Sequence, residues 1–185
     1  MLNNQLHVIS VQPYGYIDGP EDRGSGALGS RSRLDKGLEI ARELPRTSEI
    51  IFLFPQGYGK NNPTKRHKRF FSLGESMALY VTSMLPEEHP HIRVSSKPLS
   101  WGTMNDIRAL YLMLAELPVG SMPHIHFVTE PAHLKRVRMV WKYINSIGYP
   151  ATFHAATQHR MTWKERWVRE PIARLNYKYQ LSRRN

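Results

Sequence analysis

The stretch HIHFVTEPAHLKRVRMVWKYI, residues 124–144, decides the fold class because a strand pattern runs directly into a helix pattern. Residues 124–129 form a short apolar run rich in β-branched and aromatic side chains, which is typical of a buried strand. Pro131 suits the first position of a helix. Behind it, apolar residues recur at helical spacing, at Leu134, Val137, Trp141 and Ile144.

The same alternation fills the rest of the chain. Apolar runs predict four more strands, at 6–11, 49–54, 91–95 and 151–155. Helical spacing predicts three more helices, marked by Leu34 to Leu44, Leu73 to Met84 and Ile107 to Leu114. A fifth helix, or a helix pair broken at Pro171, closes the chain. Alternating strands and helices predict an α/β fold with about five mainly parallel strands and helices on both faces.

Length and composition limit the class of protein. A chain of 185 residues with 41% hydrophobic content is the size of one domain, so we expect a single folded unit over 1–185. The absence of cysteine excludes disulfides, thiolate zinc sites and thiol nucleophiles. No window has the length of a membrane span, and the N-terminus lacks a signal-peptide pattern. These features predict a cytoplasmic protein with no transmembrane segment.

The net charge of +11 predicts an anionic partner, which could be nucleic acid, a membrane surface or a phosphorylated small molecule. Much of the excess lies in a basic loop, residues 60–69, and in a basic helical C-terminal segment, residues 158–185. The alternative is a solvated loop and a solvated helix without a partner.

Two predicted connections, 12–31 and 55–71, are longer than a compact fold needs. Each follows a strand and precedes a helix, which places both at the carboxyl edge of the sheet, where ligands of open α/β folds bind. The segment GSGALG, residues 24–29, fits the spacing of a dinucleotide motif but lies far from the strand that ends at Val11. It is better explained as a flexible glycine loop, with or without a ligand beneath it.

Four helix starts fit the capping box [Ser/Thr]-x-x-[Asp/Glu], in which a hydroxyl and a carboxylate satisfy free amides. This alternative explains Glu75, Asp106 and two other carboxylates without any function. Ser100, Trp101 and Asn105 are not needed for a cap, and Trp101 could stack on a flat base or fill a hinge. The four boxes are Ser32–Asp35, Ser72–Glu75, Thr103–Asp106 and Thr162–Glu165.

His133 and Arg136 share one face near the start of their predicted helix, where free amides and the helix dipole attract anions. Together they could bind phosphate or carboxylate, and His133 could move a proton. The alternative is that both are exposed without a role. His124 and His126 lie on one side of their strand, but no third residue has helpful spacing, so we expect no metal. No Walker A sequence or nucleophile elbow is present.

Four segments together resemble the bacterial YdcF/SanA/ElyC family of unknown-function domains. They are RSRLDKGLEIA (31–41), SLGESMALYVTSML (72–85), SWGTMNDIRALYL (100–112) and VTEPAHLKRVRMVW (128–141). The resemblance covers about residues 31–141 and implies a Rossmann-like three-layer sandwich whose polar motif residues meet in one cleft. One member binds S-adenosylmethionine. Membrane-anchored members are linked to envelope integrity.

The resemblance also implies site residues. The family's Arg falls on Arg33 and its Glu on Glu75, and its partly kept glycine pair includes Gly57. Its Ser, Thr, His and Arg fall on Ser100, Thr103, His133 and Arg136. The family's Glu-Asn pair is replaced here by Asn105-Asp106. If that Glu is an obligatory base, Asn105 cannot replace it.

We therefore predict a cleft that binds an anionic, nucleotide-like or phosphorylated molecule, with S-adenosylmethionine or a nucleotide as the candidate cofactor. Its predicted ligand-binding residues are Arg33, Gly57, Ser100, Trp101, Thr103, Asn105 and Arg136. If a reaction takes place, it is transfer or hydrolysis, with His133 as acid or base and Glu75 and Asp106 as the other catalytic candidates. The alternatives are a non-catalytic ligand sensor and a module that binds nucleic acid through Lys65, Arg66, Lys68 and Arg69.

Overall fold

The computed structural model describes residues 5–12, 25–57, 72–85, 91–100, 102–118, 122–156, 168 and 170–182. Strands and helices alternate along this part of the chain, as the sequence predicts. In chain order the elements are β1 (Leu6–Val11), α1 (Ser25–Glu43), β2 (Glu49–Gln56), α3 (Leu73–Met84), β3 (Ile92–Ser100), α4 (Thr103–Leu114), β4 (His124–Thr129), α5 (Pro131–Ile144), β5 (Ala151–Ala155) and α6 (Glu170–Ser182).

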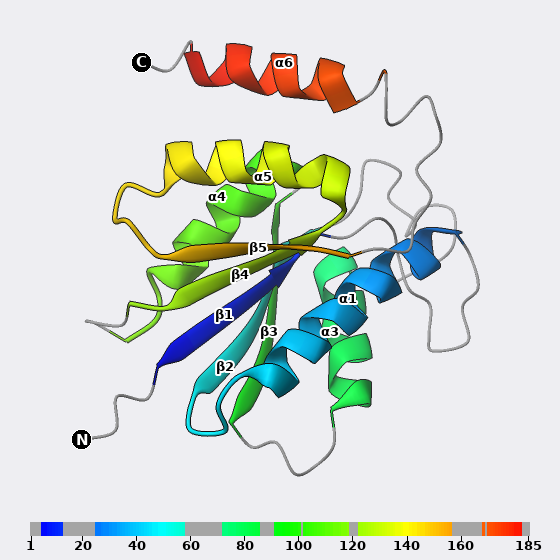
Figure 1. Cartoon of the computed structure of the whole chain (residues 1–185), viewed down its shortest axis with the longest axis vertical. Coiled ribbons are helices and arrows are strands. Elements are labelled where there is room, and N and C mark those ends of the chain that lie inside the picture. The colour runs from blue at the N-terminus through cyan, green and yellow to red at the C-terminus, as the bar shows by residue number, and fades with distance from the viewer. Residues whose placement is uncertain are drawn as a thin grey trace.

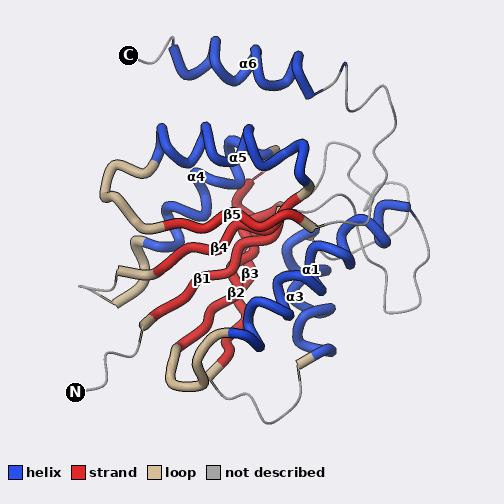
Figure 2. Tube along the Cα trace, viewed as in Figure 1, coloured by secondary structure: helices blue, strands red, loops and turns tan. Residues whose placement is uncertain are grey.

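The five strands form one parallel sheet in the order β3-β2-β1-β4-β5. The chain starts in the middle of the sheet, builds outward to β3, and then crosses back to add β4 and β5 on the other side of β1. Helices α1 and α3 cover one face and α4 and α5 cover the other, while α6 lies outside α5 (Figures 1 and 2). This arrangement confirms the Rossmann-like three-layer α/β fold.

Two apolar clusters, one on each face of the sheet, hold the layers together. Phe52 and Phe54 of β2 pack in the cluster with α1 and α3. Ile51 and Leu53, which alternate with them, pack in the cluster with α4 and α5. Because β1, β2 and β4 are covered on both faces, nearly all their residues are buried, which explains their continuous apolar runs.

The predicted strands 6–11, 124–129 and 151–155 are confirmed with the same bounds. β3 starts one residue later than predicted and continues five residues further, so Ser100 is the last residue of a strand. α6 is one helix with Pro171 at its second residue, where a missing N–H breaks no helical hydrogen bond. None of the described helices is long and apolar enough to cross a membrane.

The prediction of a loop up to residue 31 is wrong from Ser25 onward, where α1 begins. Ser32 and Asp35 therefore lie inside a helix and form no capping box, and Asp35 instead accepts a hydrogen bond of 2.8 Å from the Tyr80 hydroxyl. The start of α1 was missed for a physical reason. Its buried face includes Ser30 and Arg33, so no apolar periodicity marks it.

Of the predicted capping boxes, Ser72–Glu75 is confirmed. The Ser72 hydroxyl accepts from the Glu75 amide at 3.1 Å, and the Glu75 carboxylate accepts from the Ser72 amide at 2.5 Å. The box at Thr103 is wrong, because Gly102 occupies the N-cap position with φ 84° and no side chain caps α4. The box at Thr162 lies outside the described residues.

Gly74 marks the closest approach between α3 and β2. A Cβ atom at this position would lie 2.8 Å from the carbonyl oxygens of both Phe54 and Gln56. Those oxygens belong to a strand in the middle of the sheet, so they cannot move aside cheaply. Glycine therefore lets the first turn of α3 sit directly on the end of β2.

We predict that Gly74→Ala lowers the free energy of unfolding by about 1–3 kcal/mol, because the added methyl group forces α3 away from β2. Urea denaturation followed by circular dichroism measures this loss. Thr82→Ala, at an exposed position of the same helix, is the control and should change stability by less than about 0.5 kcal/mol. Equal stability of the Gly74→Ala and control proteins would contradict the close approach.

Candidate functional site

The candidate site lies at the carboxyl edge of the sheet. α4 starts three residues after β3 ends, and α5 starts two residues after β4 ends. The starts of both helices therefore lie at this edge. The strand order reverses between β1 and β4, and in open α/β sheets such a reversal opens the crevice in which ligands bind.

A buried ion pair occupies the point of reversal. Arg33 of α1 is fully buried, and its Nη2 lies 2.6 Å from Oε1 of Glu130, the residue between β4 and α5. Its Nη1 also donates a hydrogen bond of 2.5 Å to the carbonyl of Gln12, directly after β1. One guanidinium thus joins α1, β1 and the start of α5. Sequence reasoning predicted Arg33 as a ligand contact but missed Glu130.

Buried polar side chains also lie at the ends of the three neighbouring strands β1, β2 and β4. Ser10, Gln12, Gln56 and Thr129 are each at most 5% exposed. Gln56 Nε2 donates to the Val11 carbonyl at 3.3 Å. Within the described residues, several other polar atoms of this cluster have no hydrogen-bond partner: Ser10 Oγ, Gln12 Nε2, Gln56 Oε1, Thr129 Oγ1 and Glu130 Oε2.

Such a concentration is unusual, because nearly all buried polar atoms in proteins find a partner, whether protein, water or ligand. We name Ser10, Gln12, Gln56, Thr129 and Glu130 the switch-point cluster. Sequence reasoning missed all five residues. One sequence signal could have identified them. Each is a polar residue that stands at the end of a buried strand or directly after it.

The helix starts beside this cluster differ in their caps. α3 is closed by its capping box. α4 begins after Gly102 and α5 after Glu130, and neither N-cap residue makes a side-chain hydrogen bond to its helix. Free amides at a helix start attract anions. At α5, Pro131 has no N–H and the His133 and Leu134 amides donate to the Glu130 carbonyl, so Ala132 is the residue of the first turn whose amide is left for an anion. α4 and α5 are neighbours on one face of the sheet, so two uncapped helix starts share this edge (Figure 1).

The predicted small-molecule site residues that the structure describes belong to elements that meet at this edge. On α4, Thr103 is half-buried, Asn105 is exposed and Asp106 is buried. His133 and Arg136 are half-buried in the first two turns of α5. Ser100 ends β3, and Gly57 follows β2, where its carbonyl accepts from the Leu73 amide at 3.2 Å. Trp101 lies outside the described residues, as do Lys65, Arg66, Lys68 and Arg69.

Two of these residues already have partners within the protein. Arg33 is paired with Glu130, and the Glu75 carboxylate is bonded to the Ser72 amide. Both contacts account for the residue type without a ligand. Their roles toward a ligand, and those of the other candidates, stay predictions.

A second polar group is a row of four histidines across β1, β4 and β5. His7 Nδ1 lies 3.0 Å from His126 Nε2, and His126 Nδ1 lies 3.1 Å from His154 Nε2. His124 bonds the Thr152 hydroxyl at 2.7 Å. The shared side of His124 and His126 is as predicted. His7 and His154 were missed because only the strand order brings them together.

The surroundings of the histidine row favour the neutral form of the imidazoles. Burial is the main cause that lowers the pKa of His7, His126 and His154, and it takes that of His126 to about 3. The ring nitrogens bond one another in sequence. Within the described residues, no group of three His, Cys, Asp or Glu side chains is arranged to hold a metal ion.

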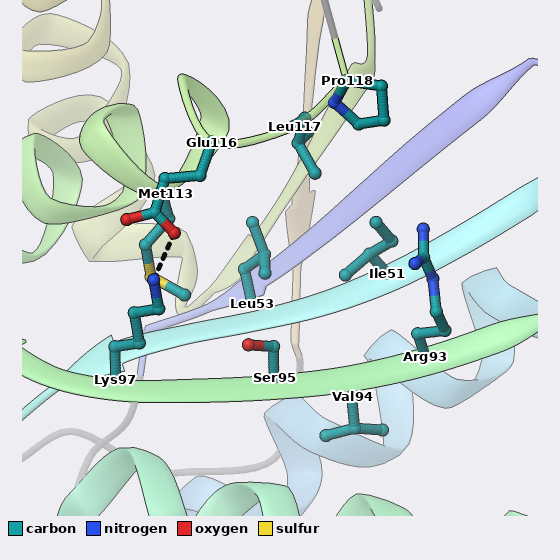
Figure 3. Close-up of a pocket in the computed structure, with 10 residues that line it drawn as sticks. All are labelled: Ile51, Leu53, Arg93, Val94, Ser95, Lys97, Met113, Glu116, Leu117 and Pro118. Atoms are coloured by element: carbon teal, nitrogen blue, oxygen red, sulfur yellow. Dashed lines mark hydrogen bonds and ion pairs between the residues drawn. The ribbon is translucent and has the colours of Figure 1, made fainter.

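A cavity of about 300 Å³ lies elsewhere, between the edge strand β3 and the C-terminal end of α4 (Figure 3). Leu53 and Met113 form part of its apolar wall, and an ion pair joins Lys97 to Glu116 at its side. None of the predicted site residues lines this cavity. It lies at the opposite end of α4 from the uncapped start and is separate from the candidate site.

Comparison with known proteins gives no assignment: no family model, no curated protein and no solved structure matches this chain. The likeness to the YdcF/SanA/ElyC family therefore stays a prediction from the residues.

We predict that Arg33→Met lowers the free energy of unfolding by about 3–5 kcal/mol, because it leaves the Glu130 carboxylate buried without its cation. Adding Glu130→Gln should recover part of this loss, since the second change removes the stranded charge. Urea denaturation of both single variants and the double variant measures the coupling. Additive losses would contradict a direct ion pair.

The histidine row predicts that the protein loses stability in acid. The folded pKa of His126, about 3, lies below the unfolded value of about 6.5. The unfolded chain therefore binds more protons between these values, so the stability is present above pH 6.5 and falls toward pH 3. Thermal unfolding monitored from pH 7 to pH 4 should show the decline. His126→Gln, which keeps a donor and an acceptor, should make it shallower, and an unchanged slope would contradict this origin.

Proposed function

We propose that this protein binds an anionic small molecule, phosphorylated or nucleotide-like, at the carboxyl edge of its sheet. One observation carries the proposal: the uncapped starts of α4 and α5 lie beside the switch-point cluster. Helix amides supply donors for an anion, and the cluster supplies further donors and acceptors for the remainder of the ligand. The net charge of +11 favours the same class of ligand.

The site contains two arginines with different proposed roles. Arg33 is neutralised by Glu130, so the pair adds little net charge toward a ligand. Arg136 lies half-buried in the second turn of α5, beside that helix's uncapped start. Because Arg136 lies on the helix that starts at this edge, we assign the ligand's anionic group to Arg136 and the helix amides. Arg33 keeps Glu130 and α5 in position.

If the bound molecule reacts, transfer or hydrolysis at a phosphoryl or glycosyl-type centre suits these groups. His133 lies in the first turn of α5 and is half-buried, which fits an acid or base at the rim of the site. The Glu75 carboxylate is engaged in its capping box. Asp106, buried in the first turn of the neighbouring α4, is the other carboxylate candidate.

We predict that Arg136→Met weakens binding of the anion by about tenfold or more, because a charge-assisted contact is lost. Native mass spectrometry of the purified protein would first identify a co-purified ligand. Calorimetry would then measure AMP, S-adenosylmethionine and inorganic phosphate against wild type and variant. Lys142→Met, an exposed cation in the last turn of the same helix, is the matched control.

Equal binding by wild type and Arg136→Met would contradict the placement of the anion at α5. Failure of all three probes to bind, with no small molecule co-purified, would contradict the proposed function itself. Loss of binding in the Lys142→Met control would show that only the general positive charge matters.

A further inference from the structure

α6 carries an exposed apolar seam. Ile172, Leu175 and Tyr179 are 60%, 67% and 52% exposed, and Val168, just before the helix, is 45% exposed. At 100° per residue, Ile172, Leu175 and Tyr179 fall within an arc of about 60° on α6. Single exposed apolar residues are ordinary on protein surfaces, but a continuous row on one helix face indicates a contact surface.

The packing of α6 on the domain leaves the seam exposed. α6 runs along the outer side of α5 as the outermost helix of its layer (Figures 1 and 2). Since the seam residues are about half exposed or more, the contact with α5 does not cover them. The helix thus meets the domain on one side and offers an apolar row on another.

The charge of the chain segment that contains α6 favours an anionic partner. α6 itself holds Glu170, Arg174 and Lys178, and the other charged residues of this segment lie outside the part of the chain that the structure describes. Residues 158–185 contain eight Lys and Arg against two Asp and Glu, a net charge of +6 and more than half of the chain's excess. Pairing of two α6 helices would bring two such segments within a Debye length, which disfavours a second copy. Nucleic acid would satisfy the charge but would leave aliphatic side chains without an apolar partner.

An anionic phospholipid surface offers both negative headgroups and an apolar layer beneath them. We propose that α6 lies in the interface of an anionic bilayer, with Ile172, Leu175 and Tyr179 inserted below the headgroups. An amphipathic helix within a basic segment lies parallel to the membrane and does not span it. The inference is independent of the proposed ligand site and needs no ligand for its test.

Cosedimentation of the full chain with vesicles tests the proposal. Vesicles of phosphatidylcholine with about 30% phosphatidylglycerol should bind the protein, and pure phosphatidylcholine vesicles should bind it far less, because the basic segment needs the anionic headgroups. Added salt should weaken the binding. Ile172→Ser with Leu175→Ser should reduce the partition coefficient by about tenfold, since two inserted side chains are lost.

Leu112→Ser, at a 64% exposed position of α4, is the matched control and should bind anionic vesicles like the wild type. Tyr179→Ser alone is the second seam variant if the double variant fails to fold by circular dichroism. Vesicle binding unchanged in the folded seam variants would overturn the proposal. A concentration-dependent dimer that these variants abolish, or binding to a DNA or RNA oligonucleotide in place of vesicles, would overturn it as well.

Discussion

The buried contact between Arg33 and Glu130 is the constraint on which the carboxyl edge depends. Arg33 rises from a helix on one face of the sheet and pairs with the residue that starts a helix on the other face. Its second bond reaches the carbonyl that follows β1. The contact therefore holds both helix layers to the central strand where the strand order reverses. Burying two charges is costly, so this pair is better explained by the geometry it fixes than by the stability it adds.

The ion pair between Arg33 and Glu130 limits which ligands the carboxyl edge can attract. Its charges cancel, so the edge attracts anions mainly through the open starts of α4 and α5 and through Arg136. Ser10, Gln12 and Thr129 add uncharged polar atoms that are buried at the same edge of the sheet. An edge with a neutral polar interior and a positive rim suits a ligand with one anionic group and a polar uncharged portion.

The sequence predicts the sheet well because β1, β2 and β4 are buried on both faces. Each of these strands is therefore a continuous apolar run that can be recognised in the sequence alone. The sequence prediction fails where the buried side chains are polar, or where a contact depends on which strands are neighbours in the sheet. The first turns of α1 bury Ser30 and Arg33, so the apolar stripe appears only from Leu34. The capping motif at Thr103 has the right letters, but Gly102 occupies the cap. The histidine row and the switch-point cluster join residues from different strands, and no local pattern contains that information.

α5 connects the two proposals physically. Its first turns carry His133 and Arg136, its buried face packs on the sheet through Val137 and Trp141, and α6 runs along its outside. Because α6 and α5 lie side by side (Figure 1), a bilayer against the α6 seam would face the same side of the domain as α5. The first turns of α5 lie at the carboxyl edge, and its outer side contacts α6. One helix therefore takes part in both proposed surfaces, so a change in its position on the sheet would affect the two together.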